Sequence, residues 1–206
     1  MSRIQTLLNH YPELDVCRRA VEAAAEALTA CYRSGGKLLL CGNGGSAADA
    51  DHIAGELLKG FQSPRPLPAG LREKLGEDLA DGLQMSLPAS PLPAFTALGT
   101  AYHNDVDAAF TYAQLVLGLG RPGDILLGIS TSGNARNVAL ALRAARGLGL
   151  TTLGLTGEHG GALPPLCDIC IQAPATETYR IQEYHLPVYH TLCLMVEDAL
   201  FPPNRD

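Results

Sequence analysis

A histidine and a carboxylate lie four residues apart just after the first glycine-rich loop of the chain. His52 and Glu56 stand at positions i and i+4 of a segment with helical periodicity, so their side chains project from one face of a helix. Imidazole and carboxylate groups are ligands for a zinc-like divalent metal, and they also serve as general acids and bases. Such pairs are also frequent on helix surfaces, so the spacing alone leaves both interpretations open.

A second group of polar side chains opens the C-terminal helical segment. The run RIQEYHLPVYH, from Arg180 to His190, contains Gln182 and His185, and a solvated helix start explains it as well as a site does. On an unbroken helix, Gln182 and His190 lie about 12 Å apart along the axis and about 80° apart around it. Either Pro187 distorts the segment, or the two residues reach each site from different subunits.

Two loops have the composition of phosphate-binding loops. The first reads CGNGGSA over residues 41–47, and the second reads ISTSGN over residues 129–134. Glycine allows close approach of the backbone to a ligand, and the following helix N-terminus presents free N–H groups to an anion. No Lys or Arg occurs in residues 42–56 or 124–135, so amide and hydroxyl groups would hold the phosphate. Ordinary helix caps have similar composition, but two such loops on one sheet favour a site.

The first loop also matches a relaxed dinucleotide-binding pattern at Gly42, Gly44 and Ala47. That pattern requires an acidic residue about 20 positions later, and residues 61–68 contain none. No Gly-Lys-Ser/Thr sequence follows the loop either, so the pattern of nucleoside triphosphate-binding loops is not met.

Apolar runs alternate with helical segments along the chain. The sequence predicts buried strands at residues 37–42, 94–98, 124–130, 151–157 and 169–174, and helices at residues 13–34, 46–60, 105–119, 134–147 and 179–200. This alternation indicates an α/β fold: a five-stranded parallel sheet flanked by helices on both faces, with an N-terminal helix. Open sheets of this kind bind ligands at the carboxyl ends of their strands, where both loops lie.

Residues 62–95 interrupt this alternation and contain six of the fourteen prolines. Leucines recur every four residues over 71–83, which predicts a short amphipathic helix inside the insertion. Insertions of this length are typical of lids or subunit contacts, and the sequence does not distinguish the two.

The composition indicates a soluble globular protein with a single domain over residues 1–206. Fifteen Lys and Arg residues stand against 21 Asp and Glu residues, a net charge of −6 that argues against nucleic acid and anionic membranes as partners. No apolar run approaches the ~20 residues of a membrane span, so we expect a cytoplasmic location. Six cysteines are too few for a disulfide scaffold, and Cys167 and Cys170 have either redox spacing or a packing role.

The linked motifs CGNGGSAADADHIAGEL, DILLGISTSGNARNV, LTGEHGG and YRIQEYH resemble those of the SIS (sugar isomerase) domain proteins. Within that family they are most similar to the bacterial phosphoheptose isomerases, over about residues 10–200. The resemblance implies an SIS-type fold, a homotetramer with active sites at subunit interfaces, and one Zn²⁺ ion per site. It implies interconversion of sedoheptulose 7-phosphate and D-glycero-D-manno-heptose 7-phosphate.

The resemblance also assigns residues to roles. It implies zinc ligands at His52, Glu56, Gln182 and His190, and an acid–base pair at Glu56 and His190. It implies substrate-contacting residues in the two loops and near the sugar: Asn43, Gly44, Gly45, Ser46, Asn104, Asp105, Ser130, Thr131, Ser132 and Gln182. Aldose–ketose isomerisation through an enediol needs such a set, because one group takes a proton, another returns it, and a metal polarises the carbonyl. The phosphate orients the sugar without reacting.

Three departures from the family pattern bear on which phosphosugar is used. Ala135 stands where a further serine is usual, Tyr179 stands where aspartate is common, and the insertion is about twenty residues longer than in typical members. An alternative is a non-catalytic SIS protein of the DnaA initiator-associating type, which binds a replication initiator and has an ending similar to Ala199-Leu-Phe-Pro. Those proteins lose the Glu and the last His, whereas this chain keeps Glu56 and His190, so the sequence favours an enzyme. A regulator with a DNA-binding domain would need more residues than these.

Overall fold

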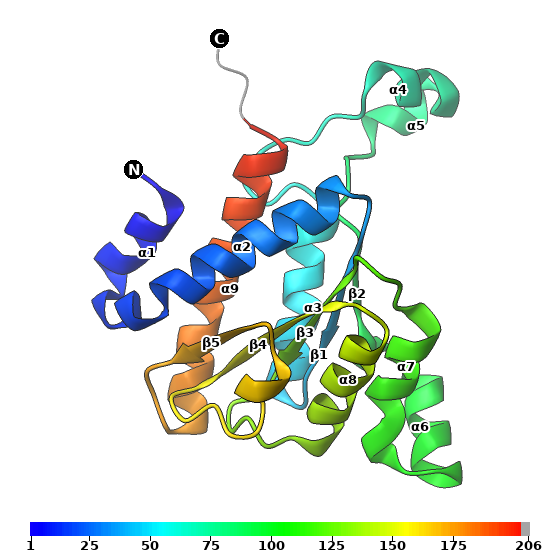
Figure 1. The fold of residues 1–206 in the computed structure, drawn as a ribbon. Coiled ribbons are helices and arrows are strands. Elements are labelled where there is room, and N and C mark those ends of the chain that lie inside the picture. Colours follow the sequence, from blue (N-terminus) through cyan, green and yellow to red (C-terminus); the bar gives the residue numbers. More distant parts are fainter. Residues whose placement is uncertain (203–206) are drawn as a thin grey trace.

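The five strands form one parallel sheet in a computed structural model that describes residues 1–202 (Figure 1). The strands are β1 (Leu38–Cys41), β2 (Ala89–Pro91), β3 (Ile125–Ile129), β4 (Thr151–Gly157) and β5 (Ile169–Ala173). They lie in the order β2-β1-β3-β4-β5, and every neighbouring pair is parallel. The predicted fold class is therefore confirmed.

Helices cover both faces of this sheet, and strand side chains alternate between two cores. Leu38 and Leu40 of β1 face one core, whereas Leu39 and Cys41 face the other, and all four are buried. The first core lies under α1 (Arg3–His10), α2 (Arg18–Arg33), α3 (Gly45–Leu58) and α9 (Thr178–Leu200). The second lies under α7 (Thr111–Leu119) and α8 (Arg136–Gly147). A strand covered on both faces must be apolar throughout, which explains the run of leucines in β1. Within residues 1–202, no helix combines the length and apolar character needed to cross a membrane.

The strand predicted at residues 94–98 is wrong. Strand β2 ends at Pro91, a 3₁₀ turn follows over Leu92–Ala94, and α6 (Thr96–Asp105) begins two residues later. Pro91 and Pro93 lack the N–H groups that would continue the ladder, and a short apolar run alone does not distinguish a strand from a helix. The helix predicted from residue 105 is α7, which begins at Thr111 after a short 3₁₀ turn (Ala108–Phe110).

The N-terminus holds two helical elements before α2. The predicted helix over residues 13–34 begins as a 3₁₀ helix (Pro12–Cys17) and continues as α2. Helix α1 was not predicted. The Ser2 hydroxyl accepts the Gln5 N–H at its start, and Leu7 and Leu8 bury its apolar side against the first core.

The insertion forms two short helices where the sequence predicted one. Helix α4 (Ala69–Leu75) ends at Gly76, and α5 (Glu77–Asp81) follows. The leucines that predicted an amphipathic helix are only half covered, with exposed fractions of 36–48%. Figure 1 shows α4 and α5 projecting from the sheet near the C-terminal end of α9. At the base of the insertion, the Gly60 N–H donates a hydrogen bond to the side chain of Gln84 over 2.8 Å.

All six cysteines lie within the described residues and are free thiols. Cys167 and Cys170 are half-buried, and both sulfur atoms approach the backbone of Gly154 in β4. The contact is consistent with a packing role for both side chains.

Candidate active site

The sheet order brings the two glycine- and hydroxyl-rich loops together. Strands β1 and β3 are neighbours, and the chain leaves β1 toward α3 on one face and β3 toward α8 on the other. Such a point of reversal is where open α/β sheets bind ligands. The side-chain amides of Asn43, in the first loop, and Asn137, in the first turn of α8, exchange two hydrogen bonds of 2.9 and 2.8 Å. Asn137 was not predicted as a site residue, although it lies in the motif DILLGISTSGNARNV, because the pattern does not show that its side chain meets Asn43.

The predicted phosphate-contacting hydroxyls line these loops. Ser46 and Ser130 are buried, Thr131 is half-buried and Ser132 is exposed. Gly44 precedes the first turn of α3, so Ser46 lies at a helix N-terminus where N–H groups attract an anion. Arg136 is the cationic residue that follows the second loop most closely in the sequence. Its guanidinium forms an ion pair of 3.1 Å with the carboxylate of Asp107.

Gln182 of α9 lies at the end of the site that the two loops form. A Cβ atom added at Gly45 would lie 2.3 Å from Gln182 Nε2, so the glutamine amide packs directly on this glycine. Any side chain at Gly45 would displace the amide, which explains why a glycine stands there.

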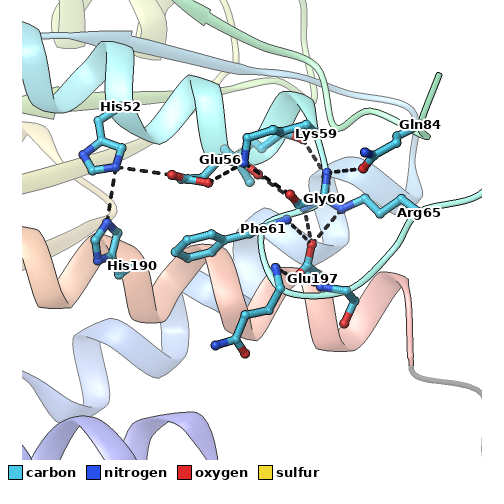
Figure 2. A network of polar contacts seen from close by, with 12 residues as sticks. His52, Glu56, Lys59, Gly60, Phe61, Arg65, Gln84, His190 and Glu197 are labelled. Atoms are coloured by element: carbon cyan, nitrogen blue, oxygen red, sulfur yellow. Dashed lines mark hydrogen bonds and ion pairs between the residues drawn. The ribbon is translucent and has the colours of Figure 1, made fainter. Parts of the chain in front are cut away.

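Three of the other predicted residues form a cluster further along α3 and α9 (Figure 2). His52 Nε2 lies 3.3 Å from Glu56 Oε1 and 3.4 Å from His190 Nε2. Glu56 Oε2 accepts a hydrogen bond of 3.1 Å from Lys59 Nζ. The carboxylate of Glu56 therefore lies between an imidazole and an ammonium group. Lys59 was not predicted, although its i, i+3 spacing from Glu56 is a signal of this contact.

Helix α9 runs from Thr178 to Leu200 without interruption, with Pro187 inside it, so Pro187 does not break the segment. Gln182 and His190 consequently remain about 12 Å apart along one helix axis, at opposite ends of the site. Within one chain, Gln182 does not join the cluster of His52, Glu56 and His190.

The ring of Phe61 covers His190, with 5.4 Å between ring centroids. Burial lowers the pKa of His190, the neighbouring His52 lowers it further, and Glu56 opposes both effects. His190 is therefore biased toward the neutral form, which can accept a proton.

A buried ion pair fixes Phe61 in this position. The Glu197 carboxylate accepts N–H groups of Phe61, Gln62 and Ser63 and also binds the guanidinium of Arg65 (Figure 2). Both charged side chains are fully buried. The sequence held no signal of this pair, because its partners lie more than 130 residues apart.

Asn104 and Asp105 lie on the exposed end of α6. They bond to each other over 2.7 Å, and across residues 1–202 no hydrogen bond or ion pair connects either to the cluster. Their predicted role at the sugar is not visible in the single chain.

The imidazole and carboxylate groups of His52, Glu56 and His190 are donors of the kinds that bind zinc. In a tetrahedral site with bonds of about 2.0–2.1 Å, two donor atoms lie roughly 3.3 Å apart. The separations from His52 Nε2 to Glu56 and to His190 match that value. In the described part of the chain, however, no group of three or more His, Cys, Asp or Glu side chains is arranged so that it could hold a metal ion. The donor groups are therefore chemically suitable for zinc, but their atoms do not surround one common position.

Comparison with known proteins identifies the family. The SIS domain model matches residues 13–157. A phosphoheptose isomerase of Rhodospirillum rubrum is 42% identical over 95% of this chain and 94% of its own length, and one of Roseiflexus is 44% identical over 91% and 89%.

Solved structures agree with the sequence matches. A phosphoheptose isomerase from Francisella tularensis superposes with a TM-score of 0.77 at 29% identity, covering 96% of this chain and all of that one. One from Neisseria gonorrhoeae superposes with a TM-score of 0.71 at 32% identity, covering 94% and 98%. Of the two predicted classes, enzyme and initiator-binding protein, these relatives support the enzyme. The chain therefore belongs to the SIS domain family, in which it groups with the phosphoheptose isomerases, and it is an isomerase.

Proposed function

We propose that the protein interconverts sedoheptulose 7-phosphate and D-glycero-D-manno-heptose 7-phosphate. The observation that carries this proposal is the convergence of His52, Glu56 and His190, in a chain about 40% identical to phosphoheptose isomerases. The paired loops after β1 and β3 supply hydroxyl and amide donors for the phosphate.

Glu56 and His190 carry out the proton transfers that the isomerisation needs. One of the two takes the proton from one carbon to form the enediol and returns it to the neighbouring carbon, and the other exchanges protons with the oxygens. Glu56 acts as the base and His190 as the acid, or the reverse. His190 is suited to this exchange because its lowered pKa favours the neutral imidazole. Lys59 Nζ donates a hydrogen bond of 3.1 Å to Glu56 Oε2 and so helps to hold the Glu56 side chain in place.

His52, Glu56, His190 and Gln182 would hold a zinc ion. When bound, the ion supplies polarisation of the substrate carbonyl. Gln182 reaches the same site only from another subunit, because α9 separates it from His190 within one chain. We therefore propose a homotetramer whose sites lie at subunit interfaces.

An NMR assay of sedoheptulose 7-phosphate turnover tests the reaction. We expect Glu56→Gln to lose at least about 100-fold in kcat, the usual contribution of a positioned acid or base. Glu183→Gln removes the same charge from an exposed position on α9 and should leave turnover unchanged. A chelator should abolish activity and added zinc should restore it. Full activity of Glu56→Gln would refute the mechanism, and the absence of any turnover of the heptose phosphate by the wild type would refute the substrate.

Mixing two inactive variants tests the shared site. If each site combines Gln182 of one subunit with His190 of another, subunits of Gln182→Ala and His190→Ala that are unfolded and refolded together should regain activity, because some sites receive both native residues. A site built within one chain would regain none.

A further inference from the structure

The side of His52 that faces away from the cluster carries a second contact. His52 Nε2 points toward Glu56 and His190, whereas Nδ1 lies 2.9 Å from the hydroxyl oxygen of Tyr189. The two rings meet edge to face, with centroids 5.4 Å apart. Tyr189 is 2% exposed, so its hydroxyl finds its partners within the protein.

Asp49 lies one helical turn before His52 on α3, and its carboxyl group is close enough to the Tyr189 hydroxyl for the two groups to shift each other's pKa. Oxygen Oδ2 of Asp49 is shut off from solvent and has no hydrogen-bond partner among residues 1–202. Burial raises the pKa of Asp49, and the neighbouring Tyr189 and His52 oppose that rise. A buried acceptor thus stands near the Tyr189 hydroxyl, which contacts His52.

The number of protons decides how these three groups are arranged. A tyrosine hydroxyl has one hydrogen to donate, and a carboxylate only accepts. If the Tyr189 hydroxyl donates to Asp49, its oxygen accepts from His52, and the hydrogen of the neutral imidazole lies on Nδ1. If the hydroxyl donates to His52 instead, the hydrogen of the imidazole lies on Nε2 and the Asp49 carboxylate receives no hydrogen from Tyr189.

We propose that Asp49 and Tyr189 hold His52 in the tautomer that carries its hydrogen on Nδ1, so that the Nε2 lone pair faces the active site. The two are positioning residues, and neither touches the reacting atoms. The inference deepens the proposed function and rests on it in one respect, that His52 Nε2 is a metal ligand. Partners of this kind orient a ligating histidine, and their loss commonly weakens metal binding by about 10–100-fold.

The tautomer is measured in metal-free protein, apart from catalysis. Long-range proton–nitrogen NMR spectra of ¹⁵N-histidine-labelled protein at about pH 8 distinguish a hydrogen on Nδ1 from one on Nε2. We expect the Nδ1–H form for His52 in the wild type. Asp49→Asn should shift His52 toward Nε2–H, because the new amide donates to the tyrosine oxygen and turns its hydrogen toward Nδ1. Tyr189→Phe should remove the preference for Nδ1–H.

Zinc affinity, measured by competition with a chromophoric chelator, is the second readout. Both variants should bind zinc about 10–100-fold more weakly than the wild type. Two matched controls should keep wild-type affinity: Tyr184→Phe, which loses a tyrosine–carboxylate hydrogen bond elsewhere on α9, and Asp51→Asn, which loses an exposed carboxylate from α3.

The outcomes separate this inference from the proposed function. An Nε2–H tautomer in the wild type, or unchanged tautomer and zinc affinity in both variants, would overturn the inference while the isomerase activity could stand. Wild-type protein that shows the Nδ1–H tautomer but does not bind zinc would support the hydrogen-bonded chain and refute the metal part of the proposed function.

Discussion

Glu197 is expected to contribute more to stability than an ordinary buried ion pair. Its carboxylate accepts the N–H groups of Phe61, Gln62 and Ser63 over 2.8, 2.8 and 3.0 Å, and the Arg65 Nε–H over 2.9 Å. Replacing Glu197 by Leu leaves three backbone donors without an acceptor. It also leaves the buried Arg65 guanidinium without its counter-charge, with Nη1 still donating to the Leu57 carbonyl over 2.6 Å.

The magnitude follows from these contacts. Breaking a buried pair costs about 3–5 kcal/mol, and each unsatisfied buried donor costs about 1–3 kcal/mol before water relieves part of it. We therefore expect Glu197→Leu to lower the free energy of unfolding by about 4 kcal/mol, or about 8–16 °C in Tm for a chain of this size. Arg65→Met should cost less, about 2 kcal/mol, because three N–H groups still solvate the carboxylate.

The double variant provides the sharpest test, with unfolding by urea followed by far-ultraviolet circular dichroism. An isolated buried pair is often replaced by apolar residues without loss of stability. Here the double variant Arg65→Met, Glu197→Leu should remain about 3 kcal/mol less stable than the wild type, because the backbone N–H groups of residues 61–63 stay unpaired. Recovery of wild-type stability would refute the reasoning, and so would a greater loss in Arg65→Met than in Glu197→Leu.

Three further predictions concern pH, backbone geometry and the paired loops. Burial lowers the pKa of His185 to about 4, below the ~6.5 of an unfolded chain, so its contribution to stability is complete above pH 6.5 and is lost as the pH falls toward 4. The free energy of unfolding of the wild type should fall between pH 7 and pH 4, and in His185→Gln this fall should be smaller by about 2–3 kcal/mol. An equal fall in both proteins would contradict the lowered pKa of His185. Gly133→Ala should destabilise by at least about 2 kcal/mol, since φ is +67° and the new Cβ would meet Gly160 O at 1.8 Å, whereas Gly99→Ala in α6 should stabilise slightly in the same urea titration. Asn137→Ala breaks the amide pair with Asn43 and should raise KM for the phosphosugar several-fold with little change in Tm, and an equal KM would show that the pair does not order the loops.

Local patterns predicted most of the fold. Strands and helices with a full apolar period, such as β4 and α9, match their predicted limits within one residue. The prediction was wrong where a local pattern was ambiguous, at residues 94–98, because only the pairing of β2 with β1 decides that residues 89–91 form the edge strand.

The residues of the candidate site likewise include some that local spacing predicted and others that it did not. His52 and Glu56 were found from their spacing, because the helix repeat alone places them on one face. Asn137, Tyr189 and Glu197 were not found, because each meets its partner across more than 90 residues.

The amino-acid sequence by itself determined the alternation of strands and helices, the donor groups of the two loops, and the residue types capable of acid–base and metal chemistry. These properties depend on neighbours a few residues apart, whose relative positions the regular backbone repeats set. Only the tertiary structure decided that β1 lies beside β3, that His52 meets His190, and that Gln182 stays at the loop end of α9. Those contacts join distant segments, and the packing of both helical layers against the sheet, rather than any local repeat, determines which segments meet.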